Sequence, residues 1–480
     1  MTEQGTAQRG TAEYDVIVLG AGPVGENVAD RAVQGGLTAV LIEHELVGGE
    51  CSYWACMPSK ALLRPAQALR AAQRVPGAAQ AVTGTLDVAA VLSRRDRFTS
   101  NWNDDGQVQW VEGAGIGLLR GHGRLSGTKQ VTVTAKDGSE TVVTARHAVV
   151  VATGSDAAIP DIPGLRDADP WTSREATSAK DVPAGLAVLG GGVVGVEMAT
   201  AYASFGSEVT LIARSGLLTG AEPFAGEKVA EALREQGVTV LLNTSASKVT
   251  RDGEEVTLEL TDGRTVTAAE VLVATGRTPR SGDIGLETVG LTPGEWLTVD
   301  DTMLVEGFDW LYAAGDINHR ALLTHQGKYQ ARAVGDVIAA RAAGKPVSDR
   351  PWGTHVATAD HRAVPQVVFS DPEVASVGLT ADAAAKAGYD IRVVDYEIGN
   401  VAGAGVYQDG YSGTARMVVD EQRKVILGVT FVGPDVDSLL QAATIAVVGE
   451  VPLDRLWHAV PAYPTVSEIW LRLLESYGRP

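Results

Sequence analysis

Residues 15–43 read DVIVLGAGPVGENVADRAVQGGLTAVLIE, which has the pattern of a β-α-β unit. The apolar run DVIVLG predicts a buried strand, and TAVLIE predicts a second strand after a helical segment. Gly20, Gly22 and Gly25 form the pattern G-x-G-x-x-G, and Glu43 lies eighteen residues beyond the last of these glycines. Such glycines let the backbone approach a pyrophosphate at a helix N-terminus, and the carboxylate accepts ribose hydroxyls. We therefore expect a dinucleotide site here.

The same pattern occurs a second time. Residues 185–214 read GLAVLGGGVVGVEMATAYASFGSEVTLIAR, in which Gly190, Gly192 and Gly195 repeat the glycine fingerprint between two apolar runs. Each fingerprint is flanked by predicted strands, and that context makes it a stronger signal than the glycines alone. The sequence therefore predicts two dinucleotide sites in two Rossmann-like α/β domains.

The two cysteines of the chain, Cys51 and Cys56, lie in the stretch GGECSYWACMPSK at 48–60. With four residues between them, they can close a small ring. Lys60 follows Cys56 by one helical turn, and a nearby cation favours the thiolate. Two buried cysteines can also serve merely as small apolar residues. Next to a dinucleotide fingerprint, we interpret them as a redox-active disulfide.

Length and composition restrict the class of protein. A chain of 480 residues predicts two to four domains, and 45% apolar with 21% charged residues is typical of a soluble globular protein. The net charge of −19 argues against nucleic-acid binding, which needs a basic face. No apolar run reaches the ~18 residues of a membrane span, and residues 1–12 resemble no targeting peptide. We expect no membrane partner and, with so few cysteines, a cytoplasmic location.

The remaining segments predict how the chain is organised. Residues 61–110 are rich in Ala, Leu and Arg at helical spacing, which predicts a helical hairpin with its charges on a solvated face. Strand-like runs fill 121–155, and the Pro- and Asp-rich segment 156–182 is interpreted as a crossing linker. From about residue 360, short alternating runs predict an antiparallel sheet with helices between its strands.

Together, the cysteine stretch, both fingerprints and ATGRTPR at 274–280 resemble the flavin-dependent pyridine nucleotide–disulfide oxidoreductases. This family includes dihydrolipoamide dehydrogenase, glutathione reductase and mercuric reductase, and the resemblance covers about residues 14–470. It implies a discontinuous FAD-binding domain (1–156 and 281–355), an NAD(P)-binding domain (157–280), and an α+β interface domain (356–480) that pairs two subunits as a homodimer.

The resemblance also implies roles for individual residues. Cys51 would exchange with the substrate, Cys56 would face the flavin, and Lys60 would pair with Glu197. The implied FAD-binding residues are Gly20, Gly22, Gly25, Glu43, Gly49, Lys60, Gly123, Thr153, Gly154, Ser155, Asp316, Leu322, Leu323, Thr324 and His325. The implied nicotinamide-cofactor residues are Gly190, Gly192, Gly195, Glu197 and Gly276. His325, at a predicted helix start, fits a structural role as well as a chemical one.

The end of the second fingerprint unit bears on the choice of nicotinamide cofactor. NAD-using members of the family carry an acidic residue where this chain has Ala213 followed by Arg214. A carboxylate repels a 2′-phosphate, whereas an arginine can pair with it. Arg214 could also be merely exposed at a strand end. We expect NADPH, with NADH as the alternative.

Two positions depart from the family pattern. Disulfide reductases of the family have a histidine before Pro-Thr, followed by a glutamate, and this pair deprotonates the exchange thiol from the partner subunit. Here Tyr463 and Glu468 stand in those places. Tyrosine has an ordinary pKa near 10 and histidine near 6.5, so we expect Tyr463 to be a poor general base, with His458 as an alternative. Glu50, directly before Cys51, should disfavour its thiolate.

We therefore expect an enzyme that passes electrons from NADPH through FAD and the cysteine pair to an acceptor that the sequence does not identify, with no metal site. Mercuric reductases also carry tyrosine in place of the histidine, but they use a further cysteine pair near the C-terminus, which this sequence lacks. The chemistry of dihydrolipoamide dehydrogenase depends on the missing histidine. A non-catalytic redox sensor is the alternative from another class; the cysteines and the Lys60–Glu197 pair weigh against it.

Overall fold

The computed structural model describes residues 10–479 and divides into two compact units. The first unit contains residues up to 57, 96–156 and 277–361, and the second contains 58–95, 157–276 and the residues from 362 onward. The division into three domains at the boundaries given above stays a prediction.

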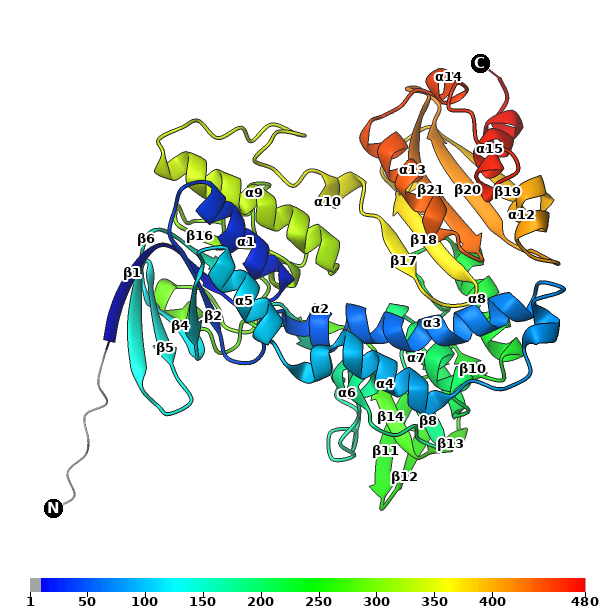
Figure 1. Ribbon diagram of the computed structural model, residues 1–480, viewed down its shortest axis with the longest axis horizontal. Coiled ribbons are helices and arrows are strands. Elements are labelled where there is room, and N and C mark those ends of the chain that lie inside the picture. The colour runs from blue at the N-terminus through cyan, green and yellow to red at the C-terminus, as the bar shows by residue number, and fades with distance from the viewer. Residues whose placement is uncertain (1–9, 480) are drawn as a thin grey trace. The chain divides into compact units, whose positions relative to one another are not determined.

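A seven-stranded sheet forms the first unit (Figure 1). Its strands, in spatial order, are β3 (Gly117–Arg120), β2 (Ala39–Glu43), β1 (Gly10–Leu19), β6 (Glu140–Val151), β5 (Gln130–Thr134) and β4 (His122–Gly127), and β16 (Leu311–Ala313) also pairs with β6. The pairs among β1, β2, β3, β6 and β16 are parallel, whereas β4 and β5 are antiparallel additions. The predicted β-α-β unit is confirmed as β1, α1 (Pro23–Gln34) and β2.

Alternation along β1 distributes its side chains to two cores. Val16 and Val18 pack with residues of α1, α5 (Asp105–Gly113) and α9 (Thr324–Ala342), whereas Ile17 and Leu19 pack with β5, β6 and the segment 284–311. Because a strand exposes successive side chains to opposite faces, this apolar run is buried on both sides.

The second unit contains the repeated fingerprint in a parallel sheet. Its order is β10 (Thr239–Leu242), β9 (Glu208–Ala213), β8 (Gly185–Leu189) and β14 (Glu270–Val273), and β8, α7 (Val193–Ser204) and β9 form the second predicted β-α-β unit. Further elements of this region are α6 (Ser173–Ser178), α8 (Pro223–Glu235) and the antiparallel strands β11 (Ala246–Asp252), β12 (Glu255–Leu260) and β13 (Thr265–Ala268).

The predicted helical hairpin is only partly correct. α3 (Cys56–Gln73) and α4 (Val88–Phe98) are linked by Arg94, whose Nη1 donates to Ala61 O at 3.1 Å. α5 instead packs against β3 of the first unit. Arg95, expected on a solvated face, is 1% exposed and donates to the carbonyl of Thr177, so the prediction is wrong for this residue.

The chain ends in a five-stranded antiparallel sheet, as predicted (Figure 1). Its order is β17 (Gln366–Val368), β18 (Glu373–Gly378), β21 (Val425–Gly433), β20 (Thr414–Asp420) and β19 (Ile391–Glu397). The accompanying helices are α11 (Ala381–Lys386), α12 (Ala402–Tyr407), α13 (Asp437–Val448), α14 (Leu453–Leu456) and α15 (Ile469–Tyr477). Two Rossmann-like regions followed by an α+β region are the predicted fold class.

Candidate active site

In the first glycine loop, two of the three glycines have no room for a side chain, and the remaining one borders open space. A Cβ on Gly20, whose φ is +99°, would lie 2.5 Å from Ala152 O, and a Cβ on Gly25 would lie 2.0 Å from Gly20 O. By contrast, the nearest atom to a Cβ on Gly22 would be Gly49 Cα at 3.9 Å. The backbone is therefore accessible where α1 begins, and a helix N-terminus is suited to a phosphate group.

Glu43 is fixed at the end of β2. Its carboxylate is buried, with Oε2 accepting the Ala21 N–H and Oε1 accepting the Glu45 N–H, both at 2.8 Å. These bonds hold the carboxylate beside the glycine loop, where the sequence predicts a contact with ribose hydroxyls.

The cysteine stretch is seated directly on this loop. The Gly48 N–H donates to Ala21 O at 2.8 Å, and a Cβ on Gly49, whose φ is +55°, would approach Gly22 Cα to 2.8 Å. A side chain at position 49 would thus separate the two loops. This close approach carries α2 (Gly49–Tyr53), and with it Cys51, to the predicted FAD site.

The two thiols lie together at the adjoining ends of α2 and α3. Both are partly buried, and Cys56 Sγ lies 3.2 Å from Oγ1 of Thr324, the first residue of α9. A hydrogen bond with Cys56 and then burial raise the pKa of the Cys51 thiol, while Thr324 and Lys328 act in the opposite direction. The structure therefore brings together the predicted pair; its disulfide stays a prediction.

Glu50 has a partner that sequence reasoning missed. Its Oε1 accepts from Arg280 Nη2 at 2.8 Å, although the two residues are 230 positions apart. The expectation that Glu50 disfavours the Cys51 thiolate assumed a carboxylate without a counter-charge, and the structure supplies one. No local pattern connects Glu50 with the last residue of ATGRTPR.

Asp316 and Ser155 also meet in the first unit. Ser155 Oγ donates to Asp316 Oδ2 at 2.6 Å, and Arg277 Nε donates to Ser155 Oγ at 2.7 Å. Gly154 has a φ of +77°, and no atom of the described residues would lie within 4 Å of a Cβ there. Two residues predicted to bind the flavin nucleotide are thus joined beside open backbone.

Gln330 of α9 supports the Asp316 segment from within the protein. The side chain is fully buried, its Oε1 accepts the Gly315 N–H at 2.8 Å, and its Nε2 donates to Asp360 Oδ2 at 2.8 Å. Burial raises the pKa of Asp360.

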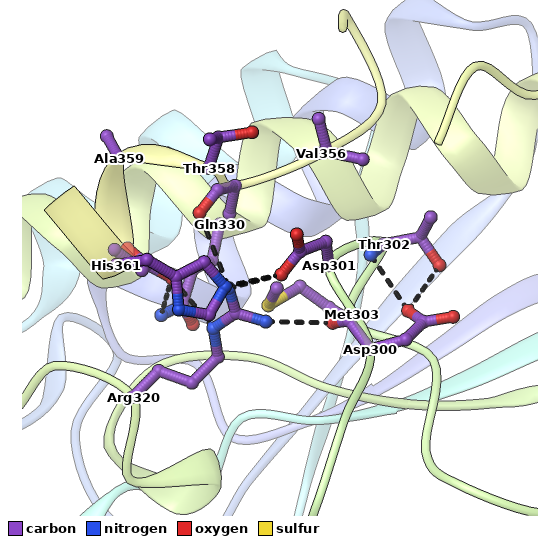
Figure 2. Close-up of polar contacts among 12 residues, drawn as sticks. Asp300, Asp301, Thr302, Met303, Arg320, Gln330, Val356, Thr358, Ala359 and His361 are labelled. Atoms are coloured by element: carbon purple, nitrogen blue, oxygen red, sulfur yellow. Dashed lines mark hydrogen bonds and ion pairs between the residues drawn. The ribbon is translucent and has the colours of Figure 1, made fainter. Parts of the chain in front are cut away.

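Figure 2 shows how Arg320 extends this network. Its guanidinium pairs with Asp301 at 2.7 Å and lies 2.6 Å from His361 Nε2. It also pairs with Asp360 at 3.2 Å. The network fixes the backbone that follows Asp316 to α9 and to the loop of Asp301. These supporting residues carry no sequence motif and were not predicted.

The first unit fits an FAD. Open backbone at Gly22 and Gly154 leaves room for phosphate and ribityl groups, which a Cβ would obstruct, and Glu43, Ser155 and Asp316 supply oriented polar atoms beside it. These are the residues that would hold the cofactor. Gly123 differs, because a Cβ there would lie 2.8 Å from Leu19 and Ile42 side-chain atoms, so packing alone already requires its small size.

The second glycine loop repeats the first. A Cβ on Gly195 would lie 2.0 Å from Gly190 O, and a Cβ on Gly192 would meet no described atom within 4 Å. β9 ends at the buried Ala213, and Arg214 is exposed directly after it. The Gly276 carbonyl accepts the N–H of Ala158 at 2.9 Å.

Lys60 and Glu197 form the predicted ion pair in the second unit. Lys60 Nζ lies 2.7 Å from Glu197 Oε2 and 4.8 Å from the centre of the Phe369 ring. The Glu197 carboxylate is 4% exposed, and its Oε1 accepts the Phe369 N–H at 3.1 Å. The contact between the two residues is thus confirmed, while its role beside a flavin stays a prediction.

The two residues of the altered C-terminal motif lie in different environments. Tyr463 is 76% exposed, whereas Glu468 is buried and its Oε2 accepts the Gly403 N–H at 3.3 Å. His458 is exposed. His325, also exposed, is the second residue of α9, and Leu322 is 37% exposed just before that helix.

Within residues 10–479, every helix is too short or too polar to span a lipid bilayer. The same range contains no group of three or more His, Cys, Asp or Glu side chains placed to hold a metal ion. The predicted cytoplasmic location stays a prediction.

Comparison with protein families gives two matches. Residues 14–344 match the model of the pyridine nucleotide-disulphide oxidoreductases, and residues 364–473 match the dimerisation domain of that group.

Individual relatives cover almost the whole chain. Mercuric reductase of Staphylococcus aureus is 30% identical over 464 residues, which are 95% of this chain and 81% of the relative. Dihydrolipoyl dehydrogenase of Chlamydia trachomatis is 30% identical over 462 residues, 95% of each chain. The Cu(II) complex of the HOCl-induced flavoprotein disulfide reductase RclA from Escherichia coli has a TM-score of 0.82 with 23% identity, covering 96% of this chain and 99% of that one, and shares its fold.

Proposed function

This chain belongs to the pyridine nucleotide–disulphide oxidoreductase family, whose members use FAD and pyridine nucleotides, and we propose that it is an NADPH-oxidising flavoenzyme with a redox-active Cys51–Cys56 pair. The observation that carries the proposal is the contact of Cys56 Sγ with Thr324 Oγ1 at 3.2 Å. Thr324 is one of the residues that the family resemblance implies for FAD binding, so the contact supports Cys56 as the thiol next to the cofactor.

FAD, when bound, accepts the reducing equivalents of the nicotinamide and makes them available one or two at a time. We expect the residues of the chain to position the nicotinamide cofactor for this transfer. The Lys60–Glu197 pair presents a buried carboxylate and a fixed ammonium, and Arg214 offers a cation to a 2′-phosphate. The matched dimerisation domain supports a homodimer, in which we expect Tyr463 and Glu468 to border the active site of the partner subunit.

The acceptor is inferred from the state of the thiols. Disulfide reduction needs a base that removes the proton of the exchange thiol, and a tyrosine side chain, such as that of the exposed Tyr463, is a less suitable base near neutral pH than the histidine it replaces. Burial and the hydrogen bond to Cys56 further oppose ionisation of Cys51. We infer an acceptor, such as a quinone, that takes electrons from the cofactor without exchange at Cys51.

Mercury(II) reduction is a second candidate, favoured by the 30% identity to a mercuric reductase over 464 residues. Against this candidate, the sequence contains only two cysteines and so lacks the further cysteine pair that mercuric reductases use to transfer the metal. An acceptor screen with NADPH, comparing a quinone, a small disulfide and Hg(II), tests the assignment. We expect the quinone to be reduced fastest. If none of the three acceptors supports NADPH oxidation, the proposal is contradicted and the redox-sensor alternative remains.

The position of Cys56 predicts a spectroscopic signature. A thiolate next to FAD should give a long-wavelength absorbance band after limited reduction by NADPH, and Cys56→Ser should remove it while Cys51→Ser retains it. An unchanged band in Cys56→Ser would show that Cys56 is not the proximal thiol.

A further inference from the structure

Arg280 lies where three segments of the first unit meet. Its backbone N–H donates to Gly154 O at 3.0 Å, and its carbonyl accepts from Thr153 Oγ1 at 2.8 Å. The backbone of Arg280 is therefore tied to the segment predicted to lie against the flavin nucleotide. From this fixed point its side chain, 25% exposed, extends to Glu50.

The guanidinium is shared by two carboxylates in different solvent environments. Nη2 lies 2.8 Å from Glu50 Oε1 and 2.5 Å from Asp156 Oδ1. The Asp156 side chain is 53% exposed, so water screens much of its charge, whereas Glu50 is 21% exposed. The ion pair with Glu50 is thus the less screened of the two.

The position of Glu50 makes this counter-charge relevant to the thiol. Glu50 directly precedes Cys51 within the five-residue helix α2. Cys56, Thr324 and the ammonium of Lys328 also act on the Cys51 thiol. Glu50 adds a carboxylate on the neighbouring residue, which disfavours the thiolate through its charge rather than by contact, and a guanidinium paired with that carboxylate offsets the effect.

We propose that Arg280 is a positioning residue for Cys51: it anchors α2 to the cofactor segment and neutralises Glu50, so that the Glu50 charge does not add to the effects that oppose ionisation of Cys51. The proposal rests on the proposed function only in that Cys51 is taken as a member of the redox-active pair. A merely architectural ion pair would change the melting temperature and leave the pH dependence of Cys51 reactivity as it is.

The chain allows a simple measurement, because Cys56→Ser leaves Cys51 as the single thiol. The rate of alkylation by iodoacetamide is recorded against pH for this parent, purified with its flavin. Adding Arg280→Gln should slow alkylation at pH 7.5 by about three- to tenfold and raise the apparent thiol pKa by about 0.5–1 unit. Arg280→Lys, which keeps the charge, should stay within about twofold of the parent, and so should the double variant Glu50→Gln/Arg280→Gln.

Two further variants keep the test decisive if Arg280→Gln loses its fold or flavin. Asp156→Asn removes the exposed partner of the same guanidinium and should change alkylation less than about twofold. Glu50→Gln should also change it less than about twofold, because its charge is already offset. A several-fold increase in Glu50→Gln would show an uncompensated carboxylate and overturn the proposal.

The remaining outcomes also decide the matter. An unchanged pH profile in folded, flavin-containing Arg280→Gln, or a double variant as slow as Arg280→Gln, would overturn the proposal. Alkylation requires neither NADPH nor an acceptor, so failure of the proposed electron transfer would be recognised separately, as absent turnover.

Discussion

The two glycine loops have nearly the same backbone and different chemistry. In both, a Cβ on the third glycine would lie 2.0 Å from the carbonyl oxygen of the first, at Gly25 over Gly20 and at Gly195 over Gly190. The strand that follows ends differently: β2 ends in the buried carboxylate of Glu43, whereas β9 ends in Ala213. We expect the shared glycines to cradle a dinucleotide in each loop, and the strand end to set which dinucleotide each loop prefers.

A second difference lies directly after the third glycine. Glu26 occupies this position in α1 and Val196 in α7, and both are buried. Glu26 Oε1 has no hydrogen-bond partner among residues 10–479. Burial raises the pKa of Glu26 to about 7, with Glu43 adding to the effect and Lys328 opposing it. The first loop therefore carries a titratable group where the second has a methyl-bearing side chain.

The largest expected effect comes from replacing the third glycine of each loop with alanine, because each substitution should impair the binding of a different cofactor. Gly195→Ala should reduce kcat/KM for NADPH by about 100-fold or more, because its Cβ would meet Gly190 O and displace the loop, while the protein remains yellow. Gly25→Ala should instead release FAD. Flavin absorbance and NADPH oxidation of both variants check this, and loss of flavin from Gly195→Ala would contradict the assignment of the two sites.

The end of the second strand should decide between NADPH and NADH. Ala213→Glu combined with Arg214→Ala should shift the ratio of kcat/KM values toward NADH by about 10–100-fold, or 1–3 kcal/mol, as a charge-assisted phosphate contact is lost. Steady-state kinetics with both nucleotides measure the ratio. A wild-type preference for NADH would refute the role given to Arg214.

Glu26 should make stability depend on pH. Its folded pKa of about 7 lies above the ordinary value near 4.3, so the folded protein binds more protons between these limits and the free energy of unfolding falls as pH rises through them. Glu26→Gln should therefore raise the melting temperature by a few degrees at pH 8, corresponding to about 1–3 kcal/mol, and change it little at pH 4.5. Equal melting temperatures at pH 8 would show that Glu26 ionises without cost.

The parts of the site that could be predicted depend on local patterns. The strands around both glycine loops follow from apolar runs, and the Lys60–Glu197 contact follows from the family resemblance. The Glu50–Arg280 pair could not be found this way, because it joins residues 230 positions apart through the fold. The prediction for Arg95 is wrong for a related reason. Helical spacing predicts a solvent-exposed charged side chain, whereas in the folded protein Arg95 is buried and donates to the carbonyl of Thr177.

The central claim is tested most directly by measuring NADPH oxidation by the wild type and by Tyr463→His, each with a quinone and with a small disulfide as the acceptor. We predict that kcat/KM for the quinone exceeds that for the disulfide by about tenfold or more, since Tyr463 is a poor base. Tyr463→His should raise disulfide reduction and leave quinone reduction within a few-fold. Rapid wild-type disulfide reduction that falls in Tyr463→His would contradict the account, and so would quinone reduction abolished by Cys51→Ser.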